Sequence, residues 1–178
     1  MRVLILSSGG KDSAYSIWWA TLRGWDVAGI VTVRIKGKDS MMFQVPTTAL
    51  AGLQSHSAGI AWLPVSINEE NDAEMLELEA AIEGVIHGSR KPRSKSWSAS
   101  DLDAADWPDS WPWPDGIKLL QPDYPIDAII VGALRSDYQK TRIEQMCHRL
   151  GVLSYTPIWH HDPDQHMNEL IDHGFEIQ

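Results

Sequence analysis

Six consecutive residues near the start of the chain have the side chains and the backbone freedom needed to hold phosphate: Ser8, Gly9, Gly10, Lys11, Asp12 and Ser13. Two glycines let backbone amides approach phosphate oxygens, and the serines add hydroxyl donors. Lys11 supplies a compact positive charge, and the Asp12 carboxylate is suited to a Mg²⁺ ion that shares those oxygens. We therefore expect an anion site in which Lys11 and Asp12 are the catalytic residues.

The surroundings of this segment support the same interpretation. It lies between an apolar run at 3–6 and a segment of helical period, where a parallel sheet places the start of a helix above the ends of strands. Its spacing matches neither the G-x-x-x-x-G-K-[ST] loop nor the G-x-G-x-x-G fingerprint. A plain serine and glycine turn that caps a helix is the alternative, but a cap does not need Gly-Gly-Lys-Asp together.

A second polar cluster, residues 132–144, follows another apolar run and leads into a helix. Because the carboxyl ends of parallel strands meet at one edge of a sheet, this cluster should face the same crevice. Gln139 and Arg142 share a helical face and could hold a carboxylate or an α-phosphate, so we expect both to be catalytic. Alternatively, Ser136 and Gln139 form a capping box and Arg142 is a solvated charge; a cap and a binding role can coexist.

Short apolar runs alternate with segments of helical period along most of the chain. Strands are predicted at 3–6, 27–33, 60–65 and 126–131, and more weakly at 152–156 and 175–177. Helices are predicted at about 14–22, 47–57 and 70–83, and a further helix follows the strand at 126–131 and ends at Leu150. This alternation predicts an α/β fold, a doubly wound and mostly parallel sheet with helices on both faces.

The segment 88–125 has no hydrophobic period and is rich in Pro, Ser, Asp and Trp. It is predicted to be a flexible insertion. The alternative is that Trp107, Trp111 and Trp113 dock on the core or on a partner, because three exposed indoles so close together would be an apolar liability.

Composition limits the possible classes of protein. A chain of 178 residues that is 43% hydrophobic predicts a single domain, here 1–178. A formal net charge of -9 makes direct nucleic-acid binding unlikely, and the absence of a long apolar run predicts no membrane role. The single cysteine and the lack of an apolar export segment at the start predict a cytoplasmic location. The oligomeric state stays open, a homo-oligomer included.

Two further groups of reactive residues are predicted to be structural. Cys147 falls on the apolar stripe of its helix and is expected to be a small core residue. The histidines at 160, 161, 166 and 173 lie near two aspartates, but their spacing fits no compact tetrahedral pattern, so we expect no metal centre there.

The string SGGKDS at 8–13 resembles the signature loop of the PP-loop ATP pyrophosphatases, within the adenine nucleotide alpha hydrolase superfamily. Residues 132–144, with 150–152 and 157–159, resemble the diphthine–ammonia ligase family, and the resemblance extends over roughly 1–85 and 125–178. It implies a HUP-type Rossmann-like fold and binding of ATP by residues 8–13 and Gly132. It also implies Mg²⁺ on Asp12.

The same resemblance implies a substrate site that includes Ser40, Met42, Ser136, Gln139 and Arg142. Residues 40–43 resemble a family motif that usually continues with histidine, but Gln44 stands there and cannot titrate. Ordinary packing beneath a loop is the alternative for the Met and Phe residues. The chain ends at Gln178, where relatives continue, so a shortened C-terminus is expected.

The activity implied by the resemblance is an ATP-dependent ligase that adenylates a substrate carboxylate and amidates it with ammonia. AMP and pyrophosphate are released, and the implied partners are ammonia and elongation factor 2 bearing diphthine, which becomes diphthamide. One rival is a tRNA-modifying enzyme of the thiolation type, which commonly needs paired cysteines or a sulfur carrier. The other is a non-catalytic adenine-nucleotide-binding module.

Overall fold

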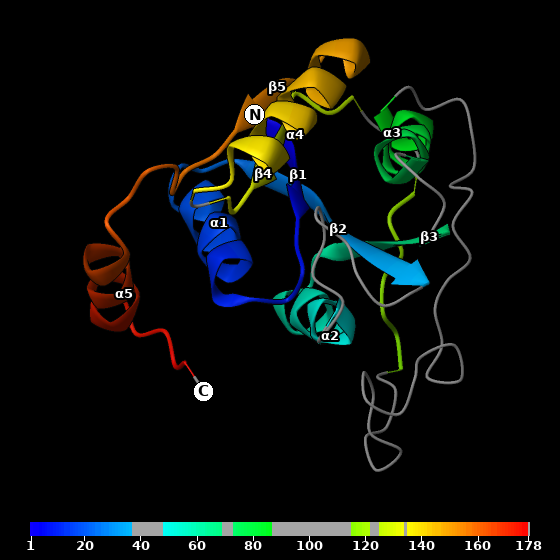
Figure 1. Ribbon diagram of the computed structural model, residues 1–178. Coiled ribbons are helices and arrows are strands. Elements are labelled where there is room, and N and C mark those ends of the chain that lie inside the picture. The colour runs from blue at the N-terminus through cyan, green and yellow to red at the C-terminus, as the bar shows by residue number, and fades with distance from the viewer. Residues whose placement is uncertain (37–47, 69–72, 87–114, 122–124, 134, 178) are drawn as a thin grey trace.

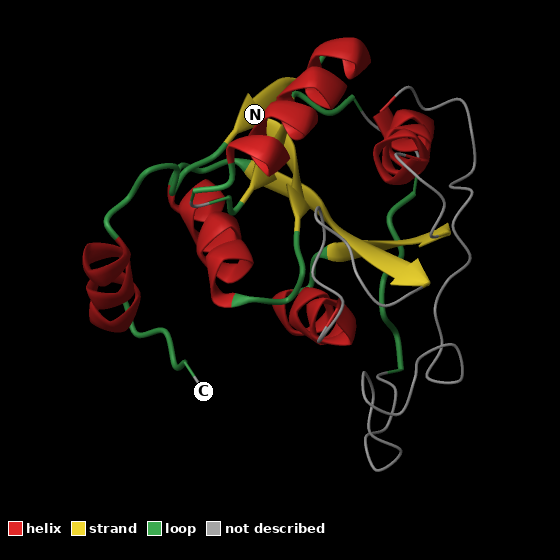
Figure 2. Ribbon diagram, in the orientation of Figure 1, coloured by secondary structure: helices red, strands yellow, loops and turns green. Residues whose placement is uncertain are grey.

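The computed structural model describes residues 1–36, 48–68, 73–86, 115–121, 125–133 and 135–177 (Figure 1). Helices and strands alternate along these segments (Figure 2). In chain order they are β1 (Arg2–Leu6), α1 (Lys11–Leu22), β2 (Asp26–Lys36), α2 (Thr48–Ala58), β3 (Ala61–Asn68), α3 (Ala73–Ile86), β4 (Ala128–Val131), α4 (Asp137–Leu150), β5 (Leu153–Tyr155) and α5 (Pro163–Asp172).

The strands form one parallel sheet in the order β3-β2-β1-β4-β5. The chain first builds outward from β1 through β2 to β3, and then returns to the other side of β1 with β4 and β5. Leu6, at the end of β1, pairs with Val31 of β2 and with Val131 of β4. The strand order therefore reverses at β1, which is where parallel sheets open a crevice at their carboxyl edge.

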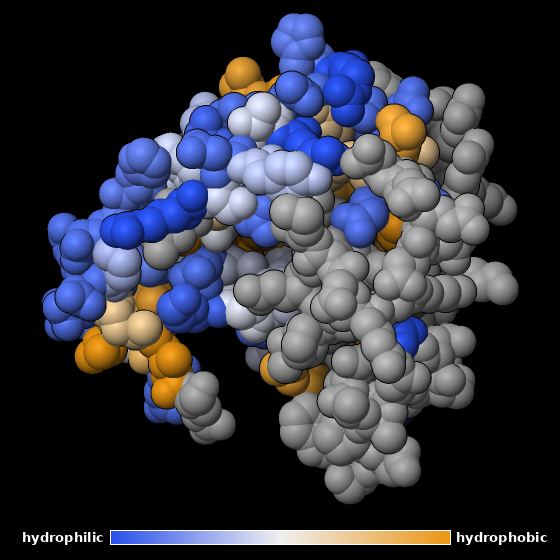
Figure 3. Space-filling view, viewed as in Figure 1, coloured by the Kyte–Doolittle hydropathy of each residue, from blue (hydrophilic) through white to orange (hydrophobic). Residues whose placement is uncertain are grey.

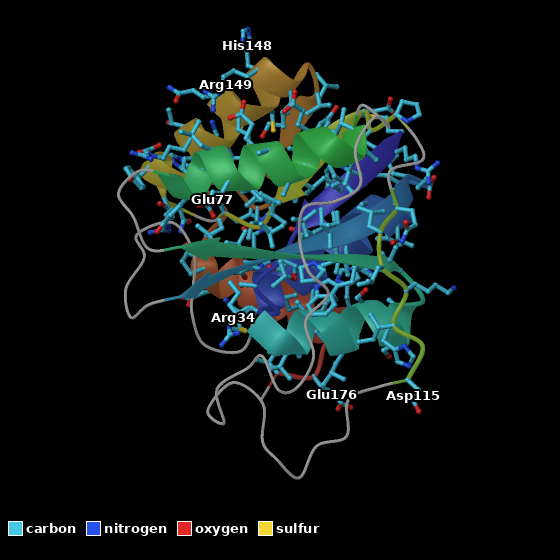
Figure 4. All side chains as sticks on the ribbon, turned by 90° about the vertical axis from the view of Figure 1, so that its right-hand side faces the viewer. Arg34, Glu77, Asp115, His148, Arg149 and Glu176 are labelled. Carbon is cyan, nitrogen blue, oxygen red and sulfur yellow. The ribbon has the colours of Figure 1, made fainter. Side chains whose placement is uncertain are left out.

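Helices cover both faces of this sheet, as the sequence predicted. Leu4 and Leu6 of β1 face a core built with α3 and α4, whereas Val3 and Ile5 face α1. The turned view in Figure 4 has α3 and α4 on one side of the sheet and α2 on the other. Arg149 of α4, labelled there, pairs with Glu79 of α3 at 2.6 Å. The predicted doubly wound α/β fold is confirmed.

Trp62 of β3 is the largest fully buried side chain among the described residues. Its indole Nε1 donates a hydrogen bond to the Thr32 hydroxyl at 2.9 Å, so the one polar group of the ring is satisfied inside the core. A Cβ added at Gly52 of α2 would lie 2.9 Å from the Trp62 ring. The indole thus sets how closely α2 packs on the sheet.

Residues 115–121, which we had placed in the flexible insertion, run alongside β3. The Trp62 amide donates to the Lys118 carbonyl, and the Leu120 amide donates to the Trp62 carbonyl, each at 2.8 Å. Leu120 is 7% exposed and joins the core, whereas the neighbouring Leu119 is 39% exposed. This part of the segment is ordered against the sheet; the tryptophans at 107, 111 and 113 lie outside the described residues.

The C-terminal region differs from the prediction. Residues 175–177 are not a strand, and α5 was not expected. Gly174 has a φ of 80°, and the Phe175 amide turns back to donate to the Leu170 carbonyl at 3.0 Å. That bond closes the end of α5 and directs the chain away from the sheet edge, so 175–177 find no strand to pair with.

The surface of the described residues is mostly hydrophilic in Figure 3, and apolar side chains gather around the end of α5. Ile171 and Ile177 there are 59% and 43% exposed. Among the helices that the structure describes, none combines the length and the apolar character needed to span a bilayer.

Replacing Leu120 by Ala tests whether residues 115–121 belong to the core. We expect Leu120→Ala to lower the free energy of unfolding by about 2 to 4 kcal/mol, because a buried side chain is lost and a cavity remains. Leu119→Ala is the matched control and should cost less than about 0.5 kcal/mol. Urea unfolding monitored by circular dichroism measures both, and equal losses would contradict the docking of this segment.

Candidate functional site

The loop at residues 8–13 joins the end of β1 to the start of α1 and is held in shape by its own neighbours. The Gly9 amide donates to the Ser7 hydroxyl at 3.1 Å, and the Ser8 amide donates to the Ser13 hydroxyl at 3.4 Å. Gly9 has a φ of 84°, a conformation that side-chain-bearing residues rarely adopt. Gln54 of α2, which sequence reasoning missed, donates to the Gly9 carbonyl at 2.9 Å.

Helix α1 begins directly at this loop. Its N-cap residue is Gly10, with φ -81° and ψ 170°, and it has no side chain to bond the first-turn amides. The first N–H groups of a helix lack partners within the helix and carry a partial positive charge. The start of α1 therefore offers the features that bind phosphate in other α/β proteins.

A cavity of about 220 Å³ lies at this point. Seven of the predicted site residues line it: Ser8, Gly10, Lys11, Asp12, Ser13, Gly132 and Gln139. The lining also includes apolar residues: Leu6, Val31, Val33, Val131, Ala133 and Ile143. A mixture of apolar side chains and a few hydrogen-bonding groups is the common composition of a small-molecule site.

Gly132 follows β4 and touches the first turn of α1. A Cβ added there would lie 2.7 Å from the Asp12 carbonyl oxygen and 3.1 Å from the Ser13 amide nitrogen. Real side chains do not approach a backbone this closely. Glycine at 132 is therefore required for α1 to start beside the end of β4.

Asp12 lies at the centre of a small ionic cluster. Its Oδ1 is 3.0 Å from Lys11 Nζ and 3.1 Å from Nε2 of His166, a histidine of α5 that is 2% exposed. Asp12 Oδ2 accepts from Lys11 at 3.2 Å. The His166 ring also meets the edge of the Tyr15 ring, with centroids 5.0 Å apart.

Sequence reasoning missed the position of His166 because α5 was not predicted. A signal was present: Asp162 before Pro163 is the usual start of a helix. In the structure the Asp162 carboxylate accepts from the Gln165 amide at 3.0 Å, and Pro163 opens α5. Recognising that start would have placed His166 in the first turn of a helix.

The second predicted cluster is only partly brought to the cavity. The Ser136 hydroxyl accepts from the Gln139 amide at 3.3 Å, so the helix cap is confirmed. Gln139 also lines the cavity, whereas Arg142 is not among the lining residues and its guanidinium lies 4.5 Å from the centre of the Tyr138 ring. Substrate contacts by Ser136, Gln139 and Arg142 stay predictions.

The remaining predicted residues have separate outcomes. Ser40, Met42 and Gln44 lie outside the described residues. Cys147 is 1% exposed in the core between the sheet and α4, and burial raises the pKa of its thiol to about 11. Its predicted role as a core residue is confirmed, because a thiol this protonated and buried is a poor nucleophile.

Comparison with known proteins identifies the family. The family model of the diphthamide synthase N-terminal domain matches residues 1–89 and 115–154, and the chain belongs to this family. The two matched ranges together contain β1 through α4 and most of β5, with the 8–13 loop and the cluster at 132–144.

Among curated proteins, the chain is 28% identical to the diphthine–ammonia ligase of Schizosaccharomyces pombe over 98% of this chain and 26% of the relative. It is 26% identical to that of Danio rerio over 98% and 61%, and 27% identical to that of Saccharomyces cerevisiae over 96% and 22%. The chain thus spans between about a fifth and three fifths of these relatives.

A search of solved structures gave a chain described as a predicted subunit of tRNA methyltransferase from Methanocaldococcus jannaschii. Its TM-score is 0.48 at 13% identity, and the alignment covers 95% of this chain and 74% of that one.

Two glycine variants test whether the close contact at Gly132 matters for stability. We expect Gly132→Ala to lower the free energy of unfolding by about 1 to 3 kcal/mol, because the new methyl group would overlap the Asp12 carbonyl. Gly10→Ala is the matched control: its Cβ would meet only Ser8 Oγ, at 3.7 Å, and it should cost less than about 1 kcal/mol. Thermal and urea unfolding measure both, and a fully stable Gly132→Ala protein would contradict the close contact.

Proposed function

We propose that the cavity binds ATP, with its terminal phosphates on the 8–13 loop and at the start of α1. The observation that carries this proposal is the position of the loop: Ser8 and residues 10–13, which include the start of α1, line one cavity at the reversal of strand order. The apolar lining residues of β2 and α4 suit the less polar part of a nucleotide. Membership of the diphthamide synthase family supports the same assignment.

Each residue of the loop has a distinct task in this proposal. The amides and hydroxyls of residues 8–13 hold the pyrophosphate in line with the α-phosphorus, and Lys11 neutralises charge on it as it leaves. Asp12 is a chemically suitable ligand for Mg²⁺, since carboxylate oxygens are preferred by this ion. The Asp12 side chain is 27% exposed. His166 contacts its Oδ1, and Lys11 contacts its Oδ2.

The proposed reaction has two steps. A carboxylate oxygen of the substrate forms a bond to the α-phosphorus while the bond to pyrophosphate breaks. Ammonia then forms a bond to the acyl carbon, AMP leaves with the oxygen, and a proton is released to give the amide. In this proposal Gln139, which lines the cavity, donates a hydrogen bond from its side-chain amide to the carboxylate or the α-phosphate.

The proposed substrate is diphthine on elongation factor 2, which becomes diphthamide. Three relatives that align with nearly the whole chain are named diphthine–ammonia ligase, and this supports the assignment. Thiolation of tRNA is less consistent with the chain, because Cys147 is its single cysteine and is buried with a raised pKa. We further propose that the protein acts in the cytoplasm, where its protein substrate is made.

Variants of the loop test the proposal. The protein is incubated with ATP, Mg²⁺, ammonium and elongation factor 2 bearing diphthine, and the mass of the modified histidine and the release of AMP are followed. We expect Lys11→Ala and Asp12→Ala to lower turnover by at least about 100-fold, because each removes charge stabilisation that acts on the leaving pyrophosphate. Lys118→Ala, an exposed lysine outside the cavity, should be unchanged.

Two outcomes would contradict the assignment. Amide formation at the wild-type rate by folded Lys11→Ala and Asp12→Ala proteins would remove the loop from the mechanism. Binding of ATP by the wild-type protein with no release of pyrophosphate in the complete mixture would instead favour a non-catalytic nucleotide-binding module.

A further inference from the structure

Three side chains at the start of α5 lie close enough to share one metal ion. One ligand atom each from His161, His166 and Glu169 lies within 4.8 Å of the others, and this is the one such group of three found in the described parts of the chain. His166 and Glu169 are three residues apart on one face of α5. His161 comes from the preceding turn, where its amide bonds back to the Ile158 carbonyl at 3.1 Å.

The grouping was not expected from the spacing of these residues, which predicted no metal centre; that prediction is untested, and the grouping makes it worth testing. The histidines seemed too irregularly placed for a compact site, with prolines and acids between them. In the structure the turn before α5 contains His160 at a φ of 58°. The ring centroids of His161 and His166 lie 6.1 Å apart, a proximity that the linear sequence does not reveal.

The contact between His166 and Asp12 indicates which nitrogen of the His166 ring can bind a metal. Nε2 lies 3.1 Å from Asp12 Oδ1, and a carboxylate only accepts hydrogen bonds, so Nε2 carries the proton. In a neutral ring the other nitrogen, Nδ1, then presents a lone pair. The His166 side chain is only 2% exposed, so water has little access to Nδ1. Nδ1 nevertheless has no hydrogen-bond partner among the described residues.

A buried acceptor without a partner carries a free-energy cost unless something binds it. A metal ion on Nδ1 would remove that cost. It would also complete a familiar pattern, in which a histidine that binds metal donates its other N–H to a carboxylate that orients the ring. Asp12 would be that carboxylate for His166.

The second ligand on α5 is oriented in a similar way. The Tyr15 hydroxyl donates to Glu169 Oε1 at 2.9 Å. Burial, together with this bond, raises the pKa of Tyr15 to about 12, so the phenol stays a donor at neutral pH. Helix α1 thus supplies supporting contacts to two of the three candidate ligands, one from Asp12 and one from Tyr15.

We propose that His161, His166 and Glu169 bind one divalent transition-metal ion of the Zn²⁺ type. Two imidazole nitrogens and one carboxylate oxygen match the ligands that Zn²⁺ takes, whereas Mg²⁺ prefers oxygen throughout. Tetrahedral ligands near 2.1 Å from a zinc ion lie about 3.4 Å apart, so the side chains must close slightly around the ion. The ion would fasten the turn at His161 to α5, on the side where His166 contacts Asp12.

Titration of metal-free protein with Zn²⁺ tests the site directly, without ATP. We expect one equivalent to bind by calorimetry, to raise the melting temperature, and to be replaceable by Co²⁺ with the visible absorption of a four-coordinate ion. His161→Ala and Glu169→Gln should each weaken binding at least about 10-fold; Glu169→Gln keeps an acceptor for Tyr15. His160→Asn is the matched control and should bind as the wild type does, since Asn tolerates its positive φ.

Three results would overturn the proposal: no stoichiometric Zn²⁺ binding by the folded wild-type protein, unchanged binding by His161→Ala and Glu169→Gln, or equal weakening by His160→Asn. Circular dichroism confirms that each variant is folded before it is compared. Because the titration involves neither nucleotide nor elongation factor 2, its failure would leave the proposed ATP chemistry untouched, and the reverse also holds.

Discussion

The backbone of Gly132 lies so close to the first turn of α1 that no side chain fits between them. An added Cβ would be 2.7 Å from the Asp12 carbonyl oxygen, so the distance between the end of β4 and the start of α1 depends on one glycine. Parallel pairing of β1 with β4 brings the two segments together. The 8–13 loop and the end of β4 meet at this point, and residues of both segments line the cavity.

The second constraint on the site comes from outside the sheet. Helix α5 packs through Leu170 in a cluster with Tyr15 of α1, and His166 is brought within 3.1 Å of Asp12. The Asp12 carboxylate therefore contacts two side chains: Lys11, which lines the cavity, and the buried His166. The orientation of its carboxylate is fixed from two directions, which favours a preorganised site over one that forms only when ligand arrives.

Sequence reasoning succeeded where the signal was local. The 8–13 loop, the apolar strands and the Ser136 cap are each defined by residues close together in the chain, and each was found. The contact of Asp12 with His166 joins residues 154 apart, and it depends on α5, whose start at Asp162-Pro163 was overlooked. The pairing of 115–121 with β3 was also non-local, because it joins Lys118 and Leu120 to Trp62, far back in the chain.

The central claim is that the loop at 8–13 holds the phosphates of ATP. Titration of ¹⁵N-labelled protein with ATP and Mg²⁺, followed by amide NMR, tests it most directly. We expect the amides of Gly9, Gly10 and Lys11 to shift far more than those of Gly24 and Gly151, which follow the far ends of α1 and α4. Saturable ATP binding that leaves these three amides unmoved would contradict it.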